Sequence, residues 1–222
     1  IGKSSSLRSR SFLVFDANKT DGPEINCLAE ELPSYSKESQ LVNVKKLESR
    51  VVGGCVNIYF ELGNSVYTNK GGTTGAVNYI TGIFNVVAEL YRRDGINVRM
   101  SQVQVWTTTE PYGASASTAL TDFGRAKQNS INGNLAQLVR LKTSGGWSGI
   151  AWVNVLCSPY GASQASGPYS YAEISASYNS SVATPTYSWS TEVITHELGH
   201  NLGSPHTHSC TWTGGAIDGC AT

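Results

Sequence analysis

The four histidines of this 222-residue chain lie within one run of thirteen residues, and their spacing constrains the local fold. His196 and His200 are four residues apart, so on a helix their imidazoles lie on one face, one turn apart. Gly203 can adopt the left-handed backbone angles that end a helix in a sharp turn, and this turn can bring His206 back towards the other two. Three imidazoles that converge in this way can bind one Zn²⁺ ion.

Glu197 follows the first of these histidines and is the usual general base at a site of this spacing. A five-residue H-E-x-x-H segment can arise by chance on an amphipathic helix, but the glycine and the third histidine complete a much more specific pattern. His208 could replace His206 as the third ligand, although the spacing from Gly203 favours His206. The motif therefore predicts one catalytic zinc ion and one carboxylate base.

The charge and the cysteine content indicate which kinds of binding partner the protein has and where it is located. The net charge is zero and only 14% of the residues are charged, which indicates neither a nucleic-acid partner nor an anionic membrane. The apolar runs are all shorter than the roughly 20 residues of a membrane span, and the first residues do not resemble a signal peptide. The five cysteines form no C-x-x-C pair and read better as disulfide partners. We therefore expect a secreted, extracellular protein whose export signal has been removed.

The chain divides by composition near residue 50. Fifteen of its thirty-two charged residues lie in the first fifty positions, and no Lys or Arg follows Lys142. We interpret residues 1–50 as an N-terminal extension or pro-segment remnant, and residues 51–222 as the catalytic domain.

Periodicity predicts alternating strands and helices in the second part. The expected strands are 55–62, 96–106, 149–157 and, as a short one, 171–176; the expected helices are 76–93, one or two pieces within 120–142, and a motif helix that begins near Ser188 or Ser190. This order predicts an α/β (α+β) fold with a twisted, mainly parallel sheet backed by helices, including the zinc-binding helix. An antiparallel edge strand is compatible with it.

The zinc motif and two upstream segments resemble one peptidase family. HELGHNLG followed by x-x-H resembles the adamalysin, or reprolysin, branch of the metzincin zinc peptidases. The segment from Asn134, NLAQL, resembles the D-x-A-Q-L-L segment of that branch, and GIAWVNVLC resembles its edge strand. The resemblance covers about residues 51–210, and the Ser-, Thr- and Tyr-rich loops are closer to secreted bacterial members.

The resemblance implies a metzincin-like fold and a zinc endopeptidase. A zinc-bound water would attack the scissile carbonyl of a polypeptide substrate, with Glu197 accepting the proton. In the family, the edge strand lies antiparallel to the bound substrate. The residues that correspond to it here are Gly149, Ile150, Ala151, Trp152 and Val153.

Two positions depart from the family pattern. The family usually has Asp directly after its third histidine, where this chain has Thr207. It also carries a methionine-containing turn well beyond that histidine, whereas the sole methionine here, Met100, lies far upstream in a predicted strand. We therefore expect a catalytic domain without this C-terminal part; association with a cleaved C-terminal part is one option.

The cysteines admit two arrangements. In the first, which the resemblance favours, Cys157 bonds to a partner in the missing C-terminal part, and the other pairs are Cys27–Cys55 and Cys210–Cys220. In the second, Cys27 is a latency cysteine whose thiolate fills the fourth zinc position, as in related zymogens. The first is preferred because the sequence around Cys27 carries no convincing switch motif.

Other functions remain as alternatives. A latent or non-catalytic zinc-containing binding module would explain the absent methionine turn, but the intact Glu197 argues against it. A metal-dependent hydrolase of a non-peptide substrate is disfavoured by the predicted edge strand. Asp218 could bind Ca²⁺, although a turn residue in Ile-Asp-Gly is the simpler interpretation.

Overall fold

The computed structural model describes residues 54–143, 148–177 and 188–217, together with Cys27, Ala29 and Leu32. In this part of the chain a five-stranded sheet has the order β2-β1-β3-β5-β4. Four strands are parallel and β4 pairs antiparallel with β5 at the edge, which confirms the predicted mainly parallel sheet with an antiparallel edge strand. The strands are β1 (Cys55–Leu62), β2 (Asn97–Val105), β3 (Leu135–Leu141), β4 (Gly149–Ala151) and β5 (Tyr169–Ile174).

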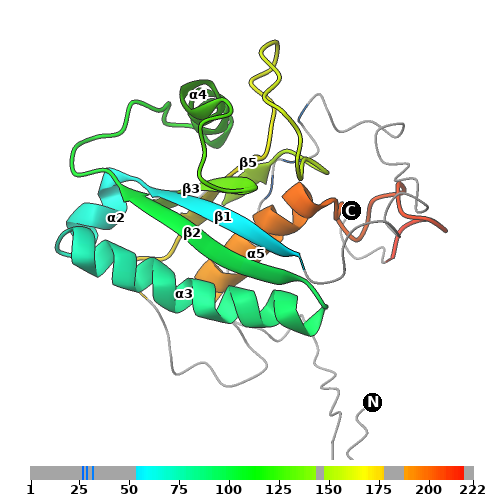
Figure 1. The fold of residues 1–222 in the computed structure, drawn as a ribbon, viewed down its shortest axis with the longest axis horizontal. Coiled ribbons are helices and arrows are strands. Elements are labelled where there is room, and N and C mark those ends of the chain that lie inside the picture. The colour runs from blue at the N-terminus through cyan, green and yellow to red at the C-terminus, as the bar shows by residue number, and fades with distance from the viewer. Residues whose placement is uncertain are drawn as a thin grey trace, which may run out of the picture.

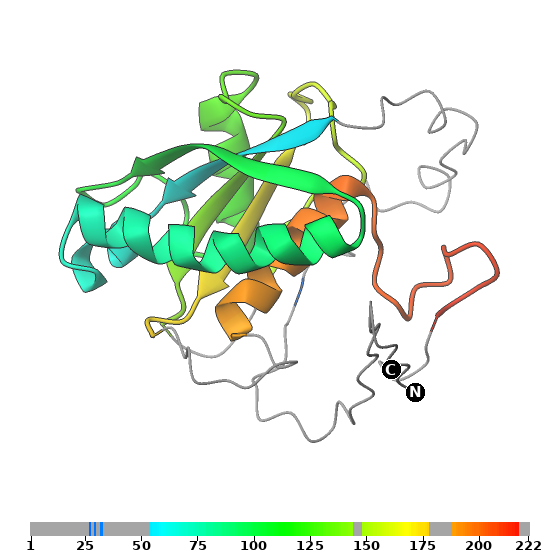
Figure 2. The ribbon, with the colours of Figure 1, turned by 60° about the horizontal axis from the view of Figure 1, so that its bottom comes forward.

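The helices cover both faces of the sheet (Figures 1 and 2). They are α2 (Asn64–Asn69), α3 (Thr73–Arg93), α4 (Ala116–Lys127) and α5 (Trp189–Leu202). Helices α3 and α5 share one apolar core with the sheet, and α4 packs on the other face in a second core. None of the helices in the described ranges is both long and apolar enough to span a membrane.

The largest error in the predicted elements concerns residues 120–142. Only their first part is helical, in α4, whereas the segment after Gly133 forms the central strand β3. Leu135, Ala136, Leu138 and Val139 are all buried because both faces of a central parallel strand are covered. Such a strand reads as a continuous apolar run and shows no alternation that would distinguish it from a buried helix. The short helix α2 was not expected.

Helix α5 begins and ends where the sequence predicted. Ser188 is the N-cap, and its side chain accepts a hydrogen bond from the backbone N–H of Thr191 at 3.2 Å. Gly203 ends the helix with φ of 108°, in the left-handed region that favours glycine. The buried side chains of Val193, Ile194 and Leu198 fix the helix against the sheet. The helix therefore presents the histidine-bearing face to the edge formed by β4.

Candidate metal centre

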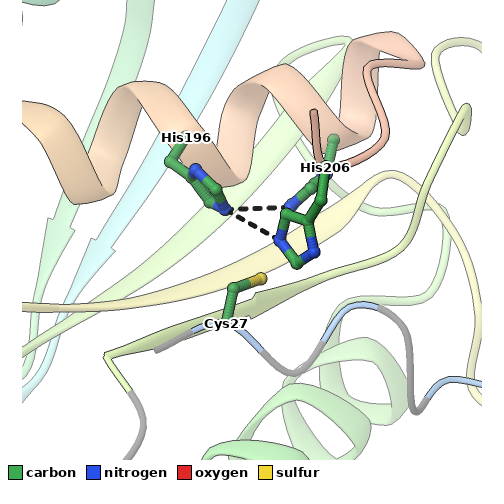
Figure 3. A group of neighbouring side chains, drawn as sticks. Cys27, His196 and His206 are labelled. Carbon is green, nitrogen blue, oxygen red and sulfur yellow. Dashed lines mark hydrogen bonds between the residues drawn. The ribbon is translucent and has the colours of Figure 1, made fainter. Parts of the chain in front are cut away.

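Helix α5 and the turn after it bring the three predicted histidines together. The Nε2 atom of His196 lies 3.0 Å from that of His200 and 3.2 Å from that of His206, and the last two are 3.2 Å apart. Figure 3 shows His196 and His206 pointing towards one another. Ligands of a tetrahedral zinc at 2.0–2.1 Å are separated by about 3.3–3.4 Å. The observed separations of 3.0–3.2 Å are slightly shorter, so a small outward movement of the rings would let all three nitrogens bind one zinc ion.

The protonation of these rings also fits a metal. The Nδ1 atom of His200 lies 2.6 Å from the carbonyl oxygen of Ser204, a contact that places the proton on Nδ1 and leaves Nε2 as the ligand atom. Burial, together with the neighbouring imidazoles, lowers the pKa of His196 to about 3. The ring is thus neutral at pH 7, which is the form that binds metals.

The third histidine is held by the residues that follow it. The indole Nε1 of Trp212 donates a hydrogen bond to the backbone carbonyl of His206 at 2.8 Å, and the backbone N–H of Ser209 donates to the same oxygen at 3.0 Å. His208 stacks on the ring of His206, but it does not belong to the cluster of potential ligands. The sequence alone gave no signal for the role of Trp212.

Glu197 lies fully buried beside the histidines. Burial raises the pKa of Glu197 to about 8, whereas a hydrogen bond from Cys27 acts in the opposite direction. One carboxylate oxygen accepts from the thiol of Cys27 at 3.5 Å, and the other has no hydrogen-bond partner among the described residues. A carboxyl group with a pKa in this range can exchange a proton near neutral pH.

Gly149, the first residue of β4, has no side chain, and the side chain of Glu197 occupies the space that one would take. A Cβ atom at this position would lie 2.6 Å from the Cδ atom of Glu197 and 2.7 Å from its Cγ atom, closer than real side chains approach. The carboxylate therefore lies against the backbone of the edge strand. Any larger residue at position 149 must displace it.

For the peptide hydrolysis that the sequence motif predicts, Gly149→Ala should lower kcat/KM about 10²-fold, since a shift of about 1 Å in a catalytic group can cost that much. Gly82→Ala is the matched control, because a Cβ atom at Gly82 meets nothing within 4 Å. Steady-state kinetics and thermal unfolding of both variants check the prediction. An unchanged kcat/KM in a folded Gly149→Ala variant would contradict it.

The predicted substrate-binding residues begin in the edge strand and continue beyond it. Gly149, Ile150 and Ala151 form β4, while Trp152 and Val153 follow the strand as buried residues. Asn201 ties this segment to α5: its side-chain N–H₂ donates to the carbonyl of Trp152 at 2.8 Å and to that of Tyr169 at 3.0 Å. Asn201 was missed from the sequence, because its partners are distant in the chain. These two hydrogen bonds hold α5 at a fixed distance from the end of β4 and from β5.

Cys27 completes the cluster from a distant part of the chain. Its sulfur and the three imidazoles offer ligand atoms that all lie within 4.8 Å of one another, and Figure 3 shows the sulfur directed at the histidines. Cys27 forms an isolated parallel bridge with Gly149, and Ala29 is fully buried. These described residues of the N-terminal extension thus pack against the predicted catalytic domain.

The predicted disulfide between Cys27 and Cys55 is wrong. Among the described residues Cys55 forms no disulfide, with Cys27 or with Cys157 or Cys210, and it is exposed at the start of β1. The fold directs Cys27 into the histidine cluster instead. Cys220 lies outside the described residues, and with it the predicted pairing to Cys210. Asp218, considered for calcium, lies outside them too.

Comparison with known proteins agrees with this geometry. Residues 55–222 match the model of the metallo-peptidase family M12, Reprolysin_5. A solved structure of a chaperone–substrate complex aligns with a TM-score of 0.52 at 16% identity, over 72% of this chain and 25% of that chain. Metalloproteinase-II from Bacteroides fragilis aligns with a TM-score of 0.42 at 18% identity, over 73% of this chain and 46% of the other. The chain thus spans less than half the length of either, and the first likeness shows a shared fold.

Proposed function

This chain belongs to the metallo-peptidase family M12, and we propose that it is a secreted zinc endopeptidase whose own N-terminal segment keeps it latent. The observation that carries the proposal is the convergence of three imidazole nitrogens beside a buried carboxylate, Glu197. Three histidines with an open fourth position are the usual ligand set of a catalytic zinc. Export is supported by the sequence composition alone.

In the proposed mechanism, a zinc ion would be held by His196, His200 and His206. Zinc bound there would supply a Lewis acid that polarises the scissile carbonyl and activates a water molecule. Glu197 accepts the proton of the attacking water and then delivers it to the leaving amine. Its contact with Gly149 keeps the carboxylate beside the strand along which the substrate would lie.

The substrate is proposed to bind by strand addition to β4. This strand pairs with β5 along one edge, and the contact on its other edge among the described residues is the bridge from Cys27. An extended polypeptide can therefore bind to the same backbone groups of β4 once the segment that contains Cys27 has dissociated from the strand. Strand addition gives affinity through the backbone and leaves selectivity to the side-chain pockets.

Cys27 is proposed to block this site. A thiolate at the position of its sulfur would complete a set of three nitrogens and one sulfur, which suits zinc, and would exclude water from the fourth position. The same segment covers the edge of β4 at Gly149. Latency would thus arise both at the metal and at the substrate strand.

A second candidate is a non-catalytic zinc-containing module. The closed set of four ligands supports it, because structural zinc sites have no open position. Against it stands Glu197, a buried carboxylate beside the cluster with an unpartnered oxygen among the described residues. A purely structural site gains no stability from burying such a group.

The deciding experiment is cleavage of a long unstructured polypeptide by the full chain after Cys27 has been alkylated. We expect cleavage that a zinc chelator abolishes and that stoichiometric Zn²⁺ restores. Thermal unfolding measured in parallel should show a lower Tm in chelator, since an ion that binds the folded state stabilises it. Cleavage that persists in chelator would contradict the zinc mechanism. Zinc binding without any cleavage would favour the binding module.

A further inference from the structure

A groove lies beside the end of β4, on the face of the sheet that α4 covers. Its wall is the outer side of α4, and its other side is formed by Trp152, Gln164 and Leu32 of the N-terminal segment. The helix residues that line it are Ser117, Thr118, Thr121 and Arg125. The groove leaves about 290 Å³ of space, and most of its lining is apolar.

Leu32 shows that an aliphatic side chain packs well at this place beside Trp152. It is partly buried and packs against the core cluster that contains Trp152 and Leu120. A turn closed by a hydrogen bond from the backbone N–H of Leu32 to the carbonyl of Ala29, at 3.3 Å, precedes it. Five residues after Cys27, the same segment therefore places an aliphatic side chain at one side of the groove.

The groove is continuous with the proposed substrate strand. Trp152 directly follows β4, and its carbonyl is fixed by Asn201. Trp152 is 1% exposed, and its buried indole N–H has no hydrogen-bond partner among the described residues. Trp152 is thus a fixed wall shared by the end of the strand and the groove. A polypeptide that extends along β4 from the histidine cluster passes Trp152.

We propose that this groove, together with the place that Leu32 takes at its side, is a substrate subsite for a large aliphatic or aromatic side chain, and that Leu32 narrows the subsite while the N-terminal segment is bound. The inference rests on the proposed function. Cys27 bridges Gly149 in parallel orientation, and the segment runs from there towards the groove. A substrate in the more stable antiparallel pairing runs in the opposite direction. It therefore reaches the groove with residues on the N-terminal side of its scissile bond.

Peptide binding tests this without requiring cleavage. The protein tested is the full chain with three substitutions. Cys27→Ala and Leu32→Ala weaken the binding of the N-terminal segment, and Glu197→Gln prevents turnover. Fluorescent peptides of one sequence carry Leu, Phe or Ala at each of five positions before the scissile bond. At one of these positions we expect the peptides with Leu or Phe to bind about tenfold more tightly than the peptide with Ala. Fluorescence anisotropy measures the Kd of each peptide.

Two variants of α4 connect this preference to the groove. Thr121→Phe fills the groove, and the Thr121 hydroxyl bonds only to carbonyls of its own helix, so the fold should be retained. It should reduce the preference to less than about twofold. Ala126→Phe adds the same ring at an exposed position of α4 outside the groove and should leave the preference intact. Equal preference in both variants, or none at any of the five positions, would overturn the inference.

Cleavage kinetics of the same peptides by a chain that retains Glu197 separate the two proposals. Cleavage without discrimination between Leu and Ala would refute the groove and leave the peptidase intact. Discrimination in binding that Thr121→Phe removes, without any cleavage, would support the groove and refute the peptidase.

Discussion

Replacing Cys27 by alanine is expected to raise the peptidase activity of the full chain at least about tenfold. The thiol lies among the three histidines and against Glu197, so it occupies the position that a water and the scissile carbonyl need. A tethered ligand acts at an effective concentration of about the millimolar range, which exceeds the KM of most substrates. Added substrate therefore cannot displace it efficiently. Initial rates of polypeptide cleavage by purified full-length protein measure the effect.

Cys55→Ala is the matched control, because that thiol is exposed and belongs to no described metal cluster. Alkylation followed by intact-mass analysis gives an independent readout. With zinc bound, Cys27 should react more slowly than Cys55, and chelation should remove the difference. Equal alkylation rates in the zinc-loaded protein, or unchanged activity in Cys27→Ala, would contradict the latency role.

Glu197→Gln is expected to lower turnover of the unblocked enzyme by about 10²–10⁴-fold while zinc remains bound, because general acid–base catalysis contributes about that much. Glutamine has nearly the same shape, so it can pack against Gly149 as the carboxylate does. It cannot accept the proton of the attacking water. Single-turnover kinetics and metal analysis of the purified variant check both parts.

Glu192→Gln serves as the control for this substitution. Glu192 lies in the first turn of α5, on the same helix, but its side chain is exposed and it is not a member of the metal cluster. We expect its kcat/KM to stay within about twofold of the parent, as for most surface substitutions. If Glu197→Gln also retains full turnover with zinc bound, a different residue accepts the proton.

The errors in the sequence prediction share one physical origin. Residues 135–141 read as helical because a strand buried on both faces shows no alternation, and its neighbours β1 and β5 are distant in the chain. Cys27 was assigned first to a disulfide because nothing around it marks a metal ligand. The contacts of Asn201 and Leu32 involve residues from other elements and left no local pattern.

The helix, the turn and the set of three histidines could be predicted from the sequence, because the histidines lie within eleven residues and their arrangement follows from helix geometry and one left-handed glycine. The sequence by itself also determined the mainly parallel sheet, through the alternation of strands and helices. The position of Cys27 could not be predicted in this way, because it lies 170 residues from Glu197 in the chain and reaches the carboxylate and the histidines through the fold. Likewise, only packing created the groove, because its walls come from α4, the end of β4 and the N-terminal segment. Local spacing fixes what one helix can present, whereas contacts across the chain depend on how the sheet brings distant segments together.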